Sequence, residues 1–181
     1  MNHQKEIEKI KESIKSGALC AINRDVIDTL SIYGFPVEMS DTLAAVAFVY
    51  DFMPDGYKIV RTSDITEVFA AEAEQFLERI VKTERPAFVP ERTGLALGSM
   101  YDLCEDLKAR DSFVTVECEG YEENIFLIGK IMQVTKKELT LRTFDGMGVW
   151  DKECASVPLG DVTCISIGNA YVNILSKYLT E

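Results

Sequence analysis

The length, composition and charge of this chain exclude several classes of protein. Its 181 residues are 47% hydrophobic and 27% charged, which allows a packed core and argues against intrinsic disorder. Its formal net charge is −11, from 30 acidic and 19 basic side chains, so the chain as a whole repels nucleic-acid phosphates at long range.

Neither an export signal nor a membrane span is evident in the sequence. The N-terminal stretch MNHQKEIEKIKESIKSG is charged throughout, and no apolar run approaches the roughly 20 residues that cross a bilayer. The five cysteines have neither metal-ligand nor redox spacing, and their odd number suits a reducing compartment. We therefore expect a soluble, cytoplasmic protein with buried free thiols, no metal and no cofactor.

The first half of the chain predicts a helix, a series of short strands and a second helix. Ile7, Ile10 and Ile14 form one stripe of an amphipathic helix. Helical spacing returns in AAEAEQFLERIVKTE, and RPAFVPERTG (85–94) has the proline and glycine content of a linker. The β-type runs between the two helices are broken by turn residues and lie at roughly 18–23, 26–39, 43–52, 57–61 and 64–69.

The same order of elements starts again after the linker. Leu97, Met100, Cys104 and Leu107 predict a helix, and Asn169 is placed as the N-cap of a last helix. The β-type runs between them lie at roughly 113–118, 124–134, 138–144, 149–157 and 162–167.

The two halves also align with each other. GALCAINRDVIDTLSIYG (17–34) matches SFVTVECEGYEENIFLIG (112–129) without a gap, which pairs Leu19 with Val114 and Gly34 with Gly129. Farther along, the hexapeptide SDITEV (63–68) matches GDVTCI (160–165). We therefore predict a duplication, with repeats at 1–84 and 95–181 joined by a linker at 85–94.

The predicted fold class is mainly β with flanking helices (α+β). Five short strands in each half can close into a small barrel, which removes exposed sheet edges, with one helix before and one after it. The alternative is one continuous α+β domain of ten strands. Pro36, inside the second strand, fits this scheme only at a sheet edge or a bulge, because it lacks a backbone donor.

Parts of both halves resemble the Sm-like fold, whose layout is an N-terminal helix, three strands, a turn and two more strands. FLIGKIMQVTKKELTLRTFD (126–145) is similar to the first Sm motif, with Gly129 at the bend of the second strand. VRTSDITEV (60–68) and VPLGDVTCI (157–165) are similar to the second motif. Arg61 holds the arginine position in the first copy, where the second copy has Pro158. The resemblance implies two tandem Sm-like barrels.

The same resemblance selects candidate binding residues for RNA or a protein partner. It implies loops that carry Arg61, Ser63, Asp64, Lys136, Lys137, Gly160 and Asp161. We also expect structural anchors at Gly34, Gly129 and Trp150. We expect the two aspartates to cap their turns by bonding backbone amides. The loops at 135–138 and 40–42 lack the asparagine that helps RNA-binding members hold a base, so RNA is possible but not favoured, and we expect no DNA or membrane partner.

No catalytic set can be assembled from the sequence. His3 is the only histidine and lies near the terminus, and no phosphate-binding glycine loop or nucleophile elbow is present. EGYEEN (119–124) lacks the ligand spacing of a calcium loop. We expect a non-enzymatic interaction or regulatory protein that assembles through barrel edge strands, at 64–69 or 162–167. The alternatives are an Sm-like RNA binder that uses Arg61, Lys136 and Lys137, and an acidic immunity or inhibitor-type protein that binds a basic partner.

Overall fold

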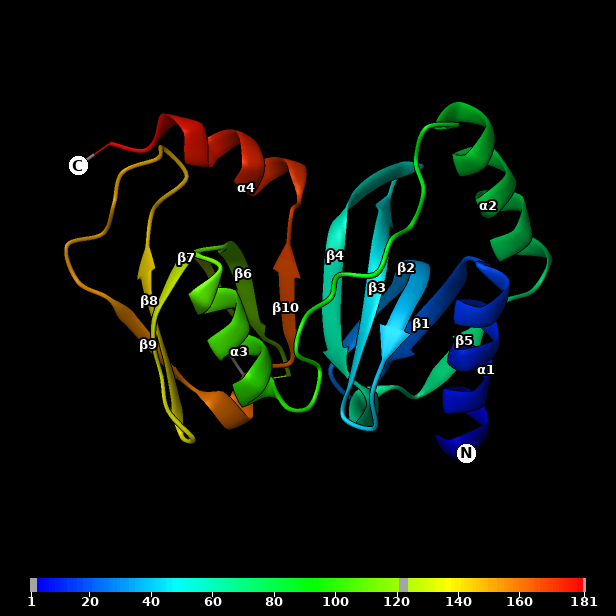
Figure 1. Ribbon diagram of the computed structural model, residues 1–181, viewed down its shortest axis with the longest axis horizontal. Helices are drawn as coiled ribbons and strands as arrows, with labels where there is room; N and C mark the ends of the chain where they lie inside the picture. Colours follow the sequence, from blue (N-terminus) through cyan, green and yellow to red (C-terminus); the bar gives the residue numbers. More distant parts are fainter. Residues whose placement is uncertain (1–2, 121–123, 181) are drawn as a thin grey trace. The chain divides into compact units, whose positions relative to one another are not determined.

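The computed structural model describes residues 3–120 and 124–180, and it divides into two compact units, Met1–Gly94 and Leu95–Glu181 (Figure 1). Both units are built from antiparallel strands with helices beside them, which confirms the predicted mainly-β class.

The first unit has five antiparallel strands in the order β5-β1-β2-β3-β4. Helix α1 packs on β2 and β5, and α2 contacts β1. The elements are α1 (His3–Ser16), β1 (Cys20–Arg24), β2 (Asp28–Met39), β3 (Leu43–Tyr50), β4 (Met53–Arg61), the 3₁₀ turn η1 (Thr62–Asp64), β5 (Glu67–Phe69) and α2 (Glu72–Glu84).

The second unit repeats this order as β10-β6-β7-β8-β9. Helix α3 packs on β7, and α4 contacts β6. The elements are α3 (Met100–Ala109), β6 (Phe113–Cys118), β7 (Ile125–Val134), β8 (Glu138–Thr143), β9 (Ala155–Pro158), the 3₁₀ turn η2 (Leu159–Asp161), β10 (Cys164–Ile167), α4 (Ala170–Leu175) and the 3₁₀ turn η3 (Ser176–Tyr178).

The sheets of the two units are open, and the closed barrels that we expected are not seen. In the first unit β4 and β5 lie at opposite ends of the strand order, and in the second unit β9 and β10 do the same. A short 3₁₀ turn joins the two end strands in each case, without a ladder between them. Each unit therefore has the five strands that we predicted, but these strands do not close into a barrel.

A glycine lies at the same point of the second strand in each unit. Gly34 pairs with Cys20 and Phe48, and Gly129 pairs with Val114 and Thr143. A Cβ atom at Gly34 would overlap the carbonyl oxygen of Ala47, and one at Gly129 would overlap that of Arg142. Glycine is required at both points because the neighbouring strand approaches too closely for any side chain.

The glycine pairing also corrects the alignment of the first strands. Because Gly34 is equivalent to Gly129, its partner Cys20 is equivalent to Val114. The gapless match of Leu19 with Val114 is therefore wrong by one residue. A change in length between the first and second strands explains the error, because the turn there can absorb a residue that a ladder cannot.

Both units also carry a β-bulge at the same place. The β2–β3 ladder shifts register between Pro36 and Glu38, and the β7–β8 ladder shifts between Ile131 and Gln133. Each shift begins two residues after the equivalent glycine. Pro36 is accommodated at this bulge, where the missing backbone donor breaks no regular ladder bond.

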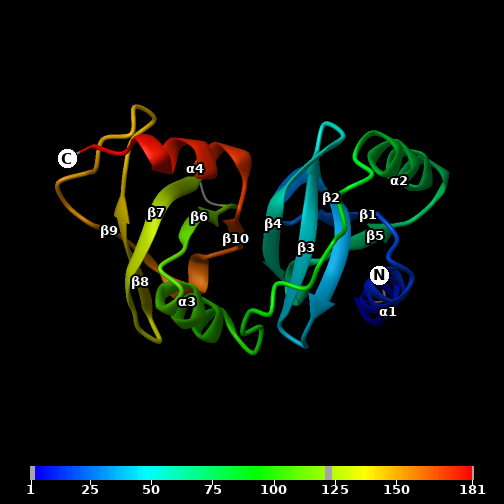
Figure 2. The same cartoon turned by 45° about the horizontal axis from the view of Figure 1, so that its top comes forward.

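The segment after α2 does not lead directly to the second unit. Residues 85–94, which we call the strap, run back across the face of the first unit's sheet (Figure 2). The Phe88 ring lies 5.9 Å from the Phe35 ring of β2, and the strap ends beside Glu38 at the bulge. The segment predicted as a linker therefore contacts the first unit through Phe88 and through the bonds at its end to Glu38.

Candidate binding groove

The residues selected from the Sm-like resemblance lie at equivalent turns of the two units. Arg61 ends β4 opposite Leu43, and Ser63 and Asp64 follow it in η1. In the second unit the Leu159 amide donates to the Lys137 carbonyl at 2.8 Å, which brings the turn of Lys136 and Lys137 beside Gly160 and Asp161 in η2.

The Lys136 side chain and the Lys137 backbone amide contact residues of their own unit. Lys136 Nζ lies 3.7 Å from the centre of the Tyr101 ring in α3, a cation–π contact. The backbone amide of Lys137 donates to Thr135 Oγ1 at 3.2 Å within the turn. Gly160 is exposed, and a Cβ atom there would meet no other atom within 4 Å.

The expected capping by Asp64 and Asp161 is wrong. Asp64 Oδ1 accepts a hydrogen bond from Ser63 Oγ at 3.0 Å, and Oδ2 is buried without a partner in the described part of the chain. No backbone amide of the described residues donates to either carboxylate. The amide after η1 instead bonds a main-chain oxygen, from Ile65 N to Thr62 O at 3.2 Å.

Threonine is the residue of the repeated hexapeptide that holds the turn. Thr66 Oγ1 accepts from the Asp25 amide at 3.1 Å and donates to the Asp25 carboxylate at 2.8 Å. Thr163 Oγ1 does the same with the amide and carboxylate of Glu119, at the same two distances. The hexapeptide is repeated because both copies need this hydroxyl, which links the fifth strand to the end of the first.

Trp150 belongs to an aromatic cluster of the second unit. Its ring centre lies 5.5 Å from that of Phe144 and 6.3 Å from that of Phe113, and the Arg142 guanidinium lies 4.4 Å above the indole. Trp150 is half-buried within this cluster.

A second group of residues, which the motifs did not indicate, surrounds the strap. The carboxylate of Glu38 is 6% exposed and holds one end of the strap. It accepts from the amides of Thr93 and Gly94 at 2.8 and 3.1 Å, from the Thr93 hydroxyl and from Arg92 Nε at 3.1 Å. Burial alone raises the pKa of Glu38, but the bonds from Thr93 and Arg92 outweigh this effect and the pKa is lowered.

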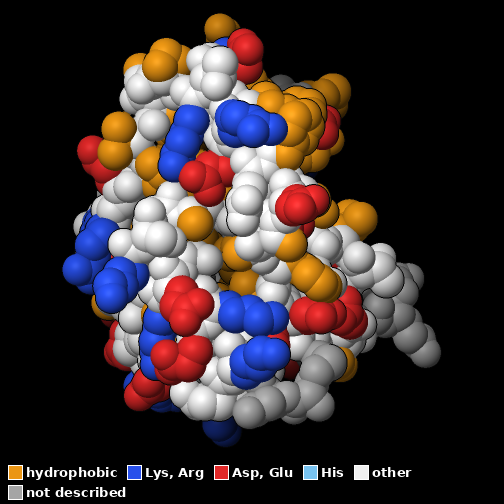
Figure 3. All heavy atoms as spheres, turned by 90° about the vertical axis from the view of Figure 1, so that its right-hand side faces the viewer, with side chains coloured by type: hydrophobic (Ala, Val, Ile, Leu, Met, Phe, Trp, Pro, Cys, Tyr) orange, Lys and Arg blue, Asp and Glu red, His pale blue; other side chains and the backbone are white. Residues whose placement is uncertain are grey.

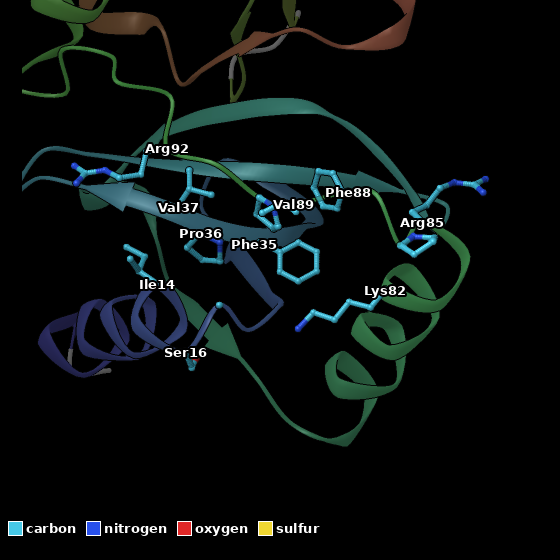
Figure 4. Close-up of a pocket in the computed structure, with 13 residues that line it drawn as sticks. Ile14, Ser16, Phe35, Pro36, Val37, Lys82, Arg85, Phe88, Val89 and Arg92 are labelled. Carbon is cyan, nitrogen blue, oxygen red and sulfur yellow. The ribbon is translucent and has the colours of Figure 1, made fainter.

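The strap, β2, the end of α1 and Lys82 enclose a hollow of about 660 Å³ (Figure 4). The floor is apolar, and three cations lie at its rim. Lys82 Nζ lies 5.9 Å from the centre of the Phe35 ring, whereas the side chains of Arg85 and Arg92 point outward on opposite sides of the hollow (Figure 4). The residues that line the hollow are Ile14, Ser16, Gly17, Phe35, Pro36, Val37, Lys82, Arg85, Pro86, Phe88, Val89, Pro90 and Arg92.

Two further hollows continue this one along the seam between α1 and β2. The first, of about 370 Å³, shares Ile14, Val37 and Arg92 and adds Lys11, Glu38 and Met39. The second, of about 360 Å³, shares Lys11 and extends to Ile7 and to Asp41 of the β2–β3 turn. We call the three together the strap groove. Figure 3 shows the side of the first unit that carries α1 and α2, where hydrophobic side chains lie in hollows beside Lys and Arg side chains.

The cations of the strap groove differ in how they are paired. Lys82 bonds Glu78 at 2.6 Å, and the exposed Arg92 bonds the buried Glu38. Arg85 donates to the Glu84 carbonyl and to Met53 Sδ, and no carboxylate of the described residues pairs with it. Arg85 is therefore the cation at which an anion would break no ion pair, and its side chain points outward from the end of the hollow (Figure 4).

No family model, curated protein or solved structure matches this chain. No group of histidine, cysteine, aspartate and glutamate within residues 3–120 and 124–180 could hold a metal ion, and Tyr121, Glu122 and Glu123 of EGYEEN lie outside those residues. No helix in the same ranges is long and apolar enough to cross a membrane. Four of the five cysteines are buried and free as expected, but Cys154 is exposed.

The strap groove could have been recognised from one sequence signal. RPAFVPERTG alternates arginine with apolar residues and proline, whereas a solvated linker contains mainly small polar residues. Its prolines led us to predict a linker, although Phe88 and Val89 supply apolar surface for packing.

Proposed function

We propose that this chain is a non-enzymatic binding protein made of two Sm-like repeats, and that its first unit binds a protein partner through the strap groove. The layout of each unit supports the Sm-like assignment, because a helix precedes five antiparallel strands with a short turn between the fourth and fifth. The shared glycine, bulge and threonine turn support descent of both units from one ancestor.

The single observation that carries the binding function is the strap groove itself. An open, apolar-floored groove with a few placed charges is typical of a recognition site. The groove also distinguishes the two repeats. Val37 is 8% exposed beneath it, whereas Met132, at the equivalent bulge position of β7, is 50% exposed. The common fold is therefore specialised for binding in the first unit.

Assembly through the edge strand of the first unit would require a rearrangement. The Val68 amide of β5 donates to Glu6 Oε2 at 2.8 Å, and the Val68 carbonyl accepts from Lys9 Nζ at 2.8 Å. These side chains of α1 occupy the backbone groups that a neighbouring strand would bond. We therefore propose that partner binding uses the strap groove and not β5.

Site-specific cross-linking in the native cells tests this proposal. The photoreactive residue p-benzoylphenylalanine replaces Val89, which lines the groove and is 66% exposed, or Val26, which is 84% exposed in the β1–β2 turn. We expect a discrete cross-linked protein from position 89 that position 26 does not give. Identical products from both positions, or none from position 89, would contradict the proposed function.

A further inference from the structure

We infer that the occupant of the strap groove is an extended peptide segment in which acidic residues alternate with apolar ones. This inference rests on the proposed function, because it names the chemical class of the partner that the same groove binds.

The charge of the 660 Å³ hollow selects an acidic partner, whereas the two smaller hollows of the groove include Glu38 and Asp41 beside Lys11. The chain has 30 acidic and 19 basic residues, yet the described residues that line the 660 Å³ hollow include three cations and no carboxylate. Arg85 is exposed and already lacks a carboxylate partner among the described residues, so an incoming carboxylate breaks no existing ion pair there. A planar guanidinium favours a carboxylate that can bond both of its nitrogens.

The floor of the groove selects apolar side chains beside those charges. Phe35 is 1% exposed, whereas Val89 is 66% exposed at the edge of the same hollow. An apolar side chain placed there removes Val89 from water and contacts Pro36 and Val37.

The length of the groove and the spread of its cations favour a peptide over a lipid. Helix α1, whose seam the groove follows, has 14 residues and is therefore roughly 20 Å long. About six residues of extended chain cover that distance. Lys11, Arg92 and Arg85 are distributed over three stretches of chain, whereas a fatty acid has a single charge to place.

The peptide is recognised by its side chains and not as an added strand. The pairing of β2 with β1 ends at Gly34, so Phe35 and Pro36 pair with β3 alone where they line the groove. Pro36 has no backbone N–H to donate, and the register of β2 shifts there, so this stretch is a poor template for an added strand. Alternation along an extended peptide places acidic side chains toward the cations and apolar ones toward the floor.

Selection from a random dodecapeptide display library tests the inference on the full-length protein. Bound peptides are collected on the wild-type chain and then measured by fluorescence anisotropy on three variants: Arg85→Glu, Val89→Ser and the control Lys177→Glu. Lys177 is exposed in the second unit, and its substitution changes the net charge by the same amount as Arg85→Glu. All three positions are exposed, so these variants retain the fold.

We expect enriched peptides that alternate acidic and apolar residues. Their affinity should fall about tenfold or more on Arg85→Glu, because a like charge replaces an attractive one, should fall on Val89→Ser, and should change less than twofold on Lys177→Glu. Enrichment of neutral or basic peptides, equal weakening by all three variants or absence of any enrichment overturns the inference. Binding of sodium laurate in place of the peptides, weakened by Arg85→Glu, also overturns it. A groove-specific cross-link at position 89 in cells would then leave the proposed function standing while this inference fails.

Discussion

At the scale of single residues, a comparison of equivalent positions in the two units shows which residues the fold requires. Gly34 and Gly129 sit where a Cβ atom would overlap a carbonyl oxygen of the next strand. Thr66 and Thr163 make the same two hydrogen bonds. Arg61 is replaced by Pro158 at the equivalent position, so an arginine is not required for the turn itself.

Substitution of the second-strand glycines tests their role. Gly129→Ala should lower the free energy of unfolding by about 1–3 kcal/mol, because the new methyl group forces the Arg142 backbone away. Urea denaturation followed by circular dichroism measures the change. Gly160→Ala is the matched control, since its Cβ atom meets nothing within 4 Å. Equal midpoints for the two variants would refute this role.

The carboxylate of Glu38 makes the stability of the strap depend on pH. Its pKa is lowered from 4.5 in the folded chain, so its contribution is complete above the unfolded pKa and is lost as the pH falls through the lower folded value. Glu38→Gln should cost about 1–3 kcal/mol at pH 7, because the bonds from Thr93 and Arg92 lose their charged acceptor.

The measurement for Glu38 is the denaturation midpoint between pH 7 and pH 3. The decline below pH 4.5 should be smaller in Glu38→Gln than in the wild-type chain. Glu91→Gln, an exposed residue of the same strap, provides the comparison and should decline as the wild type does. Parallel curves for Glu38→Gln and the wild type would show that the bond network does not stabilise the folded state.

At the scale of secondary-structure elements, α1 covers an edge strand in addition to packing on the sheet. Lys9 forms an ion pair with Glu6 at 2.7 Å while both bond Val68, so the edge of β5 is covered by a pre-formed pair. The Lys9 bond to Glu6 lowers the pKa of that carboxyl against the opposing effect of its burial. The charged form of Glu6 is thus the one that covers the strand.

Removal of this pair should expose β5 to pairing with another chain. The double substitution Glu6→Ala, Lys9→Ala should raise the average mass in sedimentation velocity above that of the wild type at the same concentration. The pair Glu8 and Lys11 is also an ion pair of α1, at 2.7 Å, but lies on its exposed face. Glu8→Ala, Lys11→Ala should leave the mass unchanged, and an equal rise in both variants would argue against a specific cover.

The elements themselves could be predicted because they depend on local patterns. Apolar spacing and turn residues located four helices and most strands, and the match of Gly34 with Gly129 identified equivalent positions of the second strand. Whether each sheet closes into a barrel could not be predicted. Closure depends on the distance between the two end strands in the folded chain and not on the sequence of either strand. The contacts of the strap could not be predicted because they join residues far apart in the chain, such as Phe88 with Phe35.

At the scale of the whole molecule, the net charge of −11 contrasts with the local cations of the strap groove. A uniformly acidic chain suits a basic partner, as in the inhibitor-type alternative, but the groove favours an acidic one. Nucleic acid is disfavoured by the long-range field and by the loops at 135–138 and 40–42, which lack the asparagine that helps RNA-binding Sm-like proteins hold a base. Lys136, a candidate phosphate contact, lies against Tyr101 instead.

We therefore expect no binding of pooled cellular RNA in a gel-shift assay at 50 mM salt. Arg61→Ala and Lys136→Glu should leave that result unchanged. A shift of the wild-type chain that disappears at 200 mM salt and weakens on Arg61→Ala would instead establish the Sm-like RNA-binding alternative.

The unequal spacing of equivalent residues in the two units indicates where this fold tolerates insertions. Cys20 and Val114, Gly34 and Gly129, and Thr66 and Thr163 are separated by 94, 95 and 97 residues respectively. The length changes therefore fall between the first and second strands and between the third and fifth, while the bulge in between is unchanged. A peptide tag placed in the β1–β2 or β3–β4 hairpin would follow changes that the fold has already accommodated, whereas one placed in the β2–β3 turn would test the bulge and the strap groove beside it.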